Sequence, residues 1–222
     1  MIHRAQCHMV LVAAKHLSVI FRKWKLPERF AVVFITIKPN RKGAEVMKVY
    51  AVRHGEIELN AENRVCGVSN GELTERGREQ AERLAEELSG ISFDAVISSP
   101  QKRALQTARP TAERCGLPVL QEPRLAEQNY GIYEGVPRDD EGFLSNKRQF
   151  AFRYPGGESM MQVAARVYGF LVELKEKRPQ DTVLLVTHGG VLRVLNSYFE
   201  DMTNEEFFRF GAQNCEWKCY EC

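Results

Sequence analysis

The sequence predicts an α/β fold in which helices cover a mostly parallel central sheet. Three runs of apolar residues are typical of strands, and each is followed by a short turn and then by a helical pattern. The runs cover residues 47–52, 93–97 and 182–186. A repeated strand–turn–helix unit indicates parallel strands, because a parallel pair needs a long crossover that is usually a helix.

The first of these strands has apolar side chains on both faces, since Val49 and Ala51 alternate with Tyr50 and Val52. It ends in the tetrapeptide Arg-His-Gly-Glu at residues 53–56. Ligands of open α/β sheets bind at the carboxyl ends of the strands. A permanent cation beside an imidazole at this edge indicates an anionic, phosphorylated ligand, although a histidine that ends a strand is more often structural.

The second strand is followed by Ser98, Ser99 and Pro100, a pattern that predicts a helix start with a serine as N-cap. Arg103 then falls in the first turn of this helix, near the end of the strand. Taken alone, Arg103 fits better as the ion-pair partner of a glutamate on its own helix.

The third strand is apolar throughout, which predicts a strand covered on both faces. His188, Gly189 and Gly190 follow it and lead into a helix that opens at residues 191–195. The three units therefore bring two arginines and two histidines to one edge, where helix N-termini add positive potential. Such a pocket suits a phosphate dianion without a P-loop or a metal.

Two further amphipathic helices are predicted as scaffold. Residues 73–88 form the first, with Thr74 as N-cap and Gly90 as the stop signal. The second follows Ser159 and ends before Pro179.

The motifs of residues 47 to about 214 resemble the histidine phosphatase superfamily, also called phosphoglycerate-mutase-like. The resemblance implies a three-layer α/β/α sandwich with a mostly parallel sheet and a short cap insertion at about 136–158. The sequence departs from the family's pattern at Ile57, where a threonine is frequent in the family. The matching segments are residues 53–56 with Asn60, 67–77, 98–104 with 107–108, 125–131 with 134–135, 155–159 and 186–190.

The resemblance also implies the roles of individual residues. His54 would be the nucleophile that forms a phosphohistidine, and Glu127 would donate a proton to the leaving oxygen. Arg53, Arg103 and His188 would hold the phosphoryl oxygens. Asn60 and the backbone near Gly67 and Gly189 would add contacts. Judged from its sequence context alone, Asn60 is typical of a turn.

The short cap favours the phosphatase branch, so we expect a metal-independent phosphomonoester hydrolase for a small phosphorylated metabolite, without a cofactor. Alternatives within the fold are a phosphoglycerate mutase, an α-ribazole phosphate phosphatase and a phosphoprotein phosphatase. A catalytically weak member that binds phosphorylated ligands is a further alternative. Arg148 and Arg153 of the cap either contact the leaving group or lie on a solvated loop.

The composition argues against several classes of protein. A net charge of +2 gives no support for nucleic-acid binding. No apolar run approaches the roughly 18 residues that a membrane span needs. The six cysteines show no spacing that requires a disulfide or a metal, so we expect reduced thiols in a cytoplasmic protein. The oligomeric state is not predicted.

Residues 1–46 match nothing in the family, and we expect them to be a non-native or disordered extension before a domain of residues 47–222. Met47 precedes the first strand and suits a translation start, since the codons for Lys42, Gly43 and Ala44 can spell a ribosome-binding sequence. If the extension exists, residues 30–37 can add an edge strand.

Overall fold

The computed structural model describes residues 9–14, 17–22 and 46–222, and the chain divides into two compact units, residues 1–45 and 46–222. In the first unit, β1 (Met9–Ala14) and β2 (Leu17–Arg22) pair antiparallel, a hairpin that the sequence pattern does not predict. The edge strand expected at residues 30–37 lies outside the described residues. Whether residues 1–46 belong to the native protein stays a prediction.

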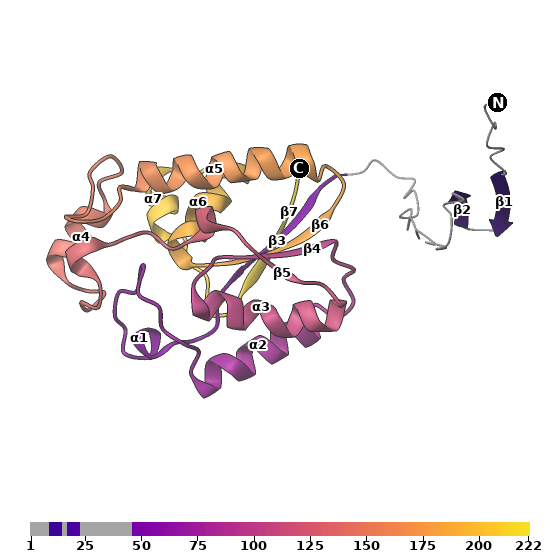
Figure 1. Cartoon of the computed structure of the whole chain (residues 1–222). Helices are drawn as coiled ribbons and strands as arrows, with labels where there is room; N and C mark the ends of the chain where they lie inside the picture. The colour runs from indigo at the N-terminus through magenta and orange to yellow at the C-terminus, as the bar shows by residue number, and fades with distance from the viewer. Residues whose placement is uncertain (1–8, 15–16, 23–45) are drawn as a thin grey trace, which may run out of the picture. The chain divides into compact units, whose positions relative to one another are not determined.

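Residues 46–222 fold around a sheet with the strand order β5-β4-β6-β3-β7 (Figure 1). Four of these strands run parallel, whereas β7 pairs antiparallel with β3 at one edge. The three predicted strands are confirmed as β3, β4 and β6. The two edge strands were not predicted, because β5 has only three residues and β7 is largely polar. The strands are β3 (Lys48–Arg53), β4 (Ala95–Ser98), β5 (Val119–Gln121), β6 (Thr182–Thr187) and β7 (Trp217–Glu221).

Helices lie on both faces of the sheet, which confirms the three-layer α/β/α prediction (Figure 1). On one face are α5 (Met160–Lys177), α6 (Gly189–Phe199) and α7 (Asn204–Arg209), and on the other α2 (Glu75–Glu87) and α3 (Lys102–Cys115). The side chains of β3 divide between two hydrophobic cores as their alternation predicts. Val49 and Ala51 belong to the core under α5, whereas Val52 belongs to the core under α2 and α3. All six residues of β6 are buried.

Helix starts were predicted correctly at two places. Thr74 is the N-cap of α2, and its hydroxyl accepts a hydrogen bond from the N–H of Gly77. Ser159 caps α5 in a reciprocal capping box with Gln162. Both helices therefore begin where the side-chain acceptor lies in the sequence.

The predicted start of α3 is wrong by two residues. The N-cap is Gln101, which makes no side-chain cap, and the helix begins at Lys102 rather than at Pro100. The Ser99 hydroxyl lies 2.7 Å from His188 Nε2, so the serine contacts an imidazole instead of capping the helix.

The cap insertion contains a short helix, α4 (Glu141–Lys147), which Asp140 caps by accepting from the N–H of Phe143. Phe143 of this helix packs in a small buried cluster with Val65 and Tyr154. The remaining short elements are α1 (Glu58–Ala61) and 3-10 turns at Pro123–Leu125 and Gly131–Tyr133. None of the helices in the described part of the chain is long and apolar enough to cross a membrane.

Candidate active site

The register of the parallel strands brings the predicted residues together. β3 and β6 pair so that Arg53 lies opposite Thr187, and the N–H of His54 donates to the carbonyl of Thr187 at 2.9 Å. Both strands therefore end at the same level of the sheet. As a result, the rings of His54 and His188 lie with their centroids 5.1 Å apart.

Arg103 lies between the two histidines and is fully buried. Its Nε is 3.2 Å from His54 Nε2 and 3.2 Å from His188 Nδ1. Its terminal nitrogens donate to the carbonyls of Gly67 at 2.7 Å and Ser69 at 2.5 Å. Arg103 is thus held by ring nitrogens and carbonyls, so its interpretation as the partner of a glutamate on its own helix is wrong.

The hydrogen bonds assign a proton to one nitrogen of each imidazole. His54 Nδ1 lies 2.7 Å from the carbonyl of Gly55, which can only accept, so Nδ1 carries the proton and Nε2 keeps its lone pair. His188 accepts from Arg103 through Nδ1 and donates from Nε2 to the Ser99 hydroxyl. Burial, reinforced by the charge of Arg103, lowers the pKa of both histidines well below the usual range. Both rings are therefore neutral near pH 7.

Arg53 presents a donor that no group in the described part of the chain satisfies. Its Nη1 donates to the carbonyl of Ala212 at 2.6 Å, but its Nε is buried and has no acceptor among the described residues. Burial lowers the pKa of this guanidinium, and the charge of Arg138 adds to the effect. Because a buried, unpaired N–H is costly, an anion bound beside Arg53 would stabilise the site.

Glu127 lies in the same cavity and is buried, with 5% of its surface exposed. Its two carboxylate oxygens accept from backbone N–H groups, Oε1 from Gln128 at 2.9 Å and Oε2 from Gly190 at 3.0 Å. A side chain at position 190 would displace this carboxylate, because an added Cβ would lie 2.6 Å from Glu127 Oε1. The first turn of α6 thereby fixes the carboxylate.

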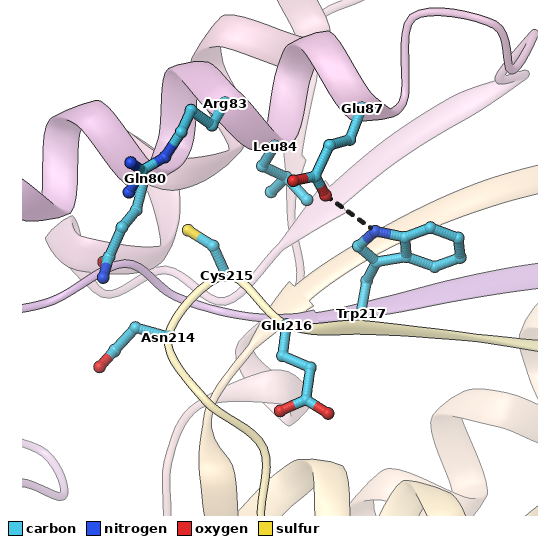
Figure 2. A pocket seen from close by; sticks show the side chains of 8 residues that line it. All are labelled: Gln80, Arg83, Leu84, Glu87, Asn214, Cys215, Glu216 and Trp217. Atoms are coloured by element: carbon cyan, nitrogen blue, oxygen red, sulfur yellow. Dashed lines mark hydrogen bonds between the residues drawn. The ribbon is translucent and has the colours of Figure 1, made fainter.

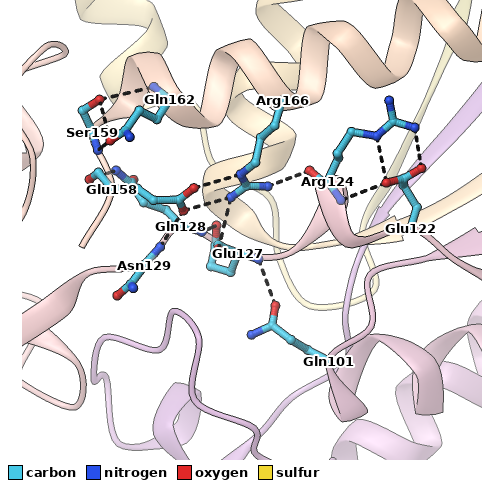
Figure 3. A network of polar contacts seen from close by, with 10 residues as sticks. All are labelled: Gln101, Glu122, Arg124, Glu127, Gln128, Asn129, Glu158, Ser159, Gln162 and Arg166. Atoms are coloured by element: carbon cyan, nitrogen blue, oxygen red, sulfur yellow. Dashed lines mark hydrogen bonds and ion pairs between the residues drawn. The ribbon is translucent and has the colours of Figure 1, made fainter. Parts of the chain in front are cut away.

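Side chains on both sides hold the backbone of Glu127 (Figure 3). Gln101 Oε1 accepts from the N–H of Glu127 at 2.9 Å, while Gln101 Nε2 donates to the carbonyl of Gly67 at 2.6 Å. On the other side, Arg166 of α5 donates to the carbonyl of Glu127 at 3.3 Å and pairs with Glu158 at 3.1 Å. The sequence analysis did not single out Gln101 or Arg166, since neither contact leaves a local pattern.

Gly67 contacts Arg103 through its backbone carbonyl. Its carbonyl accepts from Arg103 and from Gln101, and its N–H donates to Glu134 Oε2 at 2.9 Å. The amide that the resemblance assigns to phosphate is therefore engaged by a carboxylate here. A contact between phosphate and the backbone near Gly67 stays a prediction.

Asn60 lines the cavity and is tied to the nucleophile through Asn214, a residue that sequence reasoning missed. Asn214 Nδ2 donates to the carbonyl of His54 at 2.9 Å and to Asn60 Oδ1 at 3.2 Å. Ile57 is the N-cap of α1 and makes no side-chain hydrogen bond, packing instead with Leu73. The contact that a threonine would make there is absent among the described residues.

The site opens into a cavity of about 140 Å³. Arg148 and Arg153, the cap residues considered for the leaving group, are exposed and do not line it. Three other cations do, and the sequence analysis assigned none of them a role. The lining includes Arg53, His54, Asn60, Glu127, Gly189 and Gly190, together with Arg138, Phe143, Lys147 and Arg193.

A larger cavity of about 340 Å³ lies between α2 and residues 214–217 (Figure 2). Cys215 borders it in a left-handed conformation (φ 60°), and burial raises the pKa of its thiol to about 12. Such a thiol is a poor nucleophile. Two lining residues reach the loop that carries His54: Asn214 donates to the carbonyl of His54, and Gln80 Oε1 accepts from the N–H of Glu56 at 2.8 Å. Within the described residues, no group of three or more metal-ligating side chains is arranged around a common point.

Comparison with known proteins identifies relatives of the same kind. The family model for the histidine phosphatase superfamily (branch 1) matches residues 49–222. Phosphoserine phosphatase 1 of Hydrogenobacter thermophilus is 33% identical over 181 residues, which cover 78% of this chain and 85% of that protein. A probable phosphoglycerate mutase, GpmB of Cronobacter sakazakii, is 34% identical over 180 residues, covering 77% and 82%.

Solved structures agree with this assignment. A mycobacterial glucosyl-3-phosphoglycerate phosphatase has a TM-score of 0.70 at 28% identity, covering 78% of this chain and 89% of that one. A putative alpha-ribazole-5'-P phosphatase of Escherichia coli has a TM-score of 0.71 at 30% identity, covering 79% and 90%. The predicted resemblance and the histidine-type phosphatase class are confirmed. With this fold and these relatives, the chain belongs to the histidine phosphatase superfamily.

Proposed function

We propose that the protein hydrolyses phosphate monoesters of a small metabolite through a phosphohistidine on His54, without a metal. The observation that carries this proposal is the lone pair on His54 Nε2. The Gly55 carbonyl, 2.7 Å from His54 Nδ1, fixes this tautomer, and Arg103 Nε lies 3.2 Å from Nε2. The charge of Arg53 also acts on His54, and its Nε–H has no acceptor among the described residues. A neutral imidazole among donors fits attack on a phosphorus whose oxygens are negatively charged.

In the first step, His54 Nε2 forms a bond to phosphorus while the bond from phosphorus to the leaving oxygen breaks. Arg53, Arg103 and the N-terminal end of α6 compensate the charge on the equatorial oxygens. The leaving alkoxide needs a proton, and Glu127 is the carboxyl group in the cavity that can supply it. The products are an alcohol and N-phosphorylated His54.

In the second step, water attacks the phosphohistidine and the bond between nitrogen and phosphorus breaks. Glu127, now a carboxylate, takes a proton from the water and regains the state in which it began. Inorganic phosphate leaves, and His54 recovers its lone pair. The Gly190 N–H supports this role because it fixes one carboxylate oxygen at 3.0 Å in both steps.

The names of the relatives indicate the substrate class. The substrates in these names are phosphoserine, glucosyl-3-phosphoglycerate and, for a putative phosphatase, alpha-ribazole-5'-phosphate, which are all phosphate monoesters of small molecules. We infer a substrate of this size, in keeping with the small cavity. The similarity to a probable phosphoglycerate mutase favours one alternative, transfer of the phosphoryl group back to a second hydroxyl.

Phosphate release and enzyme labelling separate these outcomes. The protein is mixed with 4-nitrophenyl phosphate and with alkyl phosphates, each labelled in the phosphoryl group, in the presence of a chelator. The reaction is quenched within milliseconds and analysed for free phosphate and for acid-labile phosphoryl label on the protein. We expect both signals in the wild type and neither in His54→Asn, whose side-chain oxygen can still accept from Arg103 but cannot attack. Label without free phosphate would indicate a mutase, and turnover in His54→Asn would refute the proposal.

A further inference from the structure

The side chain of Gln101 is buried although it lies at the start of a helix. Gln101 is the N-cap of α3, a position whose polar side chain ordinarily accepts from the first N–H groups of the helix. Here Asn70 Oδ1 accepts from the N–H of Lys102 at 2.8 Å instead. The amide of Gln101 turns inward to the backbone of Glu127, and 8% of the residue is exposed (Figure 3). An amide buried to this extent needs partners for its polar atoms.

Hydrogen bonds form a closed ring that contains Gln101 and Arg103. Arg103 Nε lies 3.2 Å from His188 Nδ1, and His188 Nε2 lies 2.7 Å from the Ser99 hydroxyl. Ser99 Oγ lies 3.3 Å from Gln101 Oε1, and Gln101 Nε2 donates to the carbonyl of Gly67 at 2.6 Å. The same carbonyl accepts from Arg103 Nη2 at 2.7 Å and closes the ring. All members are buried, so each bond constrains the others.

The donors and acceptors of the ring fix the orientation of the amide. Because a guanidinium only donates, His188 accepts at Nδ1 and donates from Nε2 to Ser99. The proton of the Ser99 hydroxyl then has Gln101 Oε1 as its acceptor. Gln101 Oε1 also accepts from the N–H of Glu127 at 2.9 Å. A reversed amide would place its NH2 group against two donors and its oxygen against a carbonyl, so one orientation satisfies the site.

Gln101 thereby connects two groups that the proposed reaction needs at a fixed separation. Through Oε1 it holds the backbone of Glu127, whose carboxyl group is the proposed proton donor. Through Nε2 it holds the carbonyl of Gly67, which binds Arg103. The reaction depends on the distance between the phosphate at the arginine and the acid that protonates its leaving oxygen. A displacement of this one amide therefore moves both groups.

We propose that Gln101 is a positioning residue for the phosphoryl transfer, because its amide sets Arg103 and Glu127 relative to each other. The inference rests on the proposed phosphatase activity. It adds to that activity a residue that acts through the arginine and the glutamate rather than on the substrate itself. A residue that only stabilises the fold would change the melting temperature, whereas a positioning residue also changes how the enzyme discriminates between leaving groups.

Three variants and two measurements test the inference. Gln101→Met removes both polar atoms at similar volume, and Gln101→Glu keeps an oxygen for the N–H of Glu127 but loses the donor to Gly67. Gln106→Met is the matched control, because Gln106 Oε1 accepts from a single backbone N–H, that of Leu73, at 2.9 Å. The first measurement is the ratio of kcat/KM for an alkyl phosphate to kcat/KM for 4-nitrophenyl phosphate. The second is the Kd of inorganic phosphate by calorimetry.

Gln101→Met should change both quantities. We expect the ratio to fall at least about tenfold, because displacement of Glu127 matters most for a poor leaving group. The Kd of phosphate should rise at least about fivefold, because the carbonyl that binds Arg103 is no longer fixed. Gln101→Glu should raise the Kd to a similar extent but leave the ratio within about twofold of the wild type. Gln106→Met should change neither quantity, although its melting temperature falls by a few degrees.

The outcomes that would overturn this inference differ from failure of the proposed function. A Gln101→Met protein that is less stable but keeps the wild-type ratio and Kd would show a structural role alone. Equal changes in Gln106→Met would also overturn the inference, since a general weakening of α3 would then be the cause. If Gln101→Met does not fold, an unchanged Kd in Gln101→Glu would decide against it. In all these cases the wild type still hydrolyses monoesters, whereas a wild type without hydrolysis would remove both proposals.

Discussion

Replacing Gly190 by alanine tests whether the placement of Glu127 matters for chemistry. The added Cβ would lie 2.6 Å from Glu127 Oε1 and 3.1 Å from the hydroxyl of Tyr130. To regain an ordinary contact of 3.4 Å, the carboxylate must move by roughly 0.8 Å, which also disturbs its 3.0 Å bond from the residue-190 N–H. The backbone at Glu127 is held by Gln101 and Arg166, so the side chain, and not the loop, must give way.

A displacement of this size predicts a large kinetic effect. Misplacement of a catalytic group by about 1 Å costs on the order of 100-fold, within the 10²–10⁴ that a general acid typically contributes. We therefore expect Gly190→Ala to lower kcat/KM for an alkyl phosphate by about 100-fold. For 4-nitrophenyl phosphate, whose leaving oxygen scarcely needs a proton, the loss should stay below about tenfold.

The assay is steady-state phosphate release for both substrates, with two companion variants. Glu127→Gln should show the same dependence on the leaving group, because it removes the proton itself. Gly169→Ala in α5 meets no atom within 4 Å and should leave activity unchanged while stabilising the fold by up to about 1 kcal/mol. Equal losses on the two substrates in Gly190→Ala would refute the reasoning, since a general distortion of the phosphoryl site would then explain them.

Three further predictions concern the residues around the nucleophile. Glu134 accepts four hydrogen bonds from residues 67–69 and 130. We therefore expect Glu134→Gln to lower the free energy of unfolding by about 2–3 kcal/mol and also to lower kcat. Unchanged denaturant midpoints would contradict this. Asn214→Ala frees the carbonyl of His54, and we expect kcat to fall about tenfold with no change in Tm beyond a few degrees; an unaltered kcat would show that Asn214 does not position the nucleophile. Because the pKa values of His54 and His188 are lowered well below 6.5, nitrogen-detected NMR should find both rings neutral from pH 6 to 8, with the proton on Nδ1 of the first and Nε2 of the second. Titration of either ring near pH 6.5 would mean that burial does not control its charge.

The sequence predicts best the parts of the site that one strand or helix start delivers. Arg53, His54 and His188 each follow an apolar run, and parallel pairing places the ends of such runs at one edge. The same local logic found the caps Thr74 and Ser159. It failed at α3 because the Ser99 hydroxyl bonds to His188, 89 residues away, and no local pattern records that contact.

Long-range contacts account for the other omissions. Glu134 organises residues 67–69 across about 65 positions of sequence, and through the carbonyls of Gly67 and Ser69 it holds Arg103. A glutamate in a charged chain gives no sign of such a role. The edge strands escaped prediction for a related reason, since β7 is defined by its pairing with β3 rather than by an apolar pattern.

The site residues that the sequence predicts come from the sheet, whereas the residues that it does not predict come largely from the cap. The proposed phosphoryl transfer uses Arg53, His54 and Arg103, all fixed by the sheet and the helix that follows it, so motifs in sequence order suffice to find them. Lys147 and Arg193 also line the cavity, and they come from the short cap helix α4 and from α6. The position of a cap relative to a sheet depends on packing of residues such as Phe143 and Tyr154, which no periodicity encodes. The cap residues that line the cavity can therefore be identified only in the folded chain, whereas Arg53 and His54 are found from the strand that carries them.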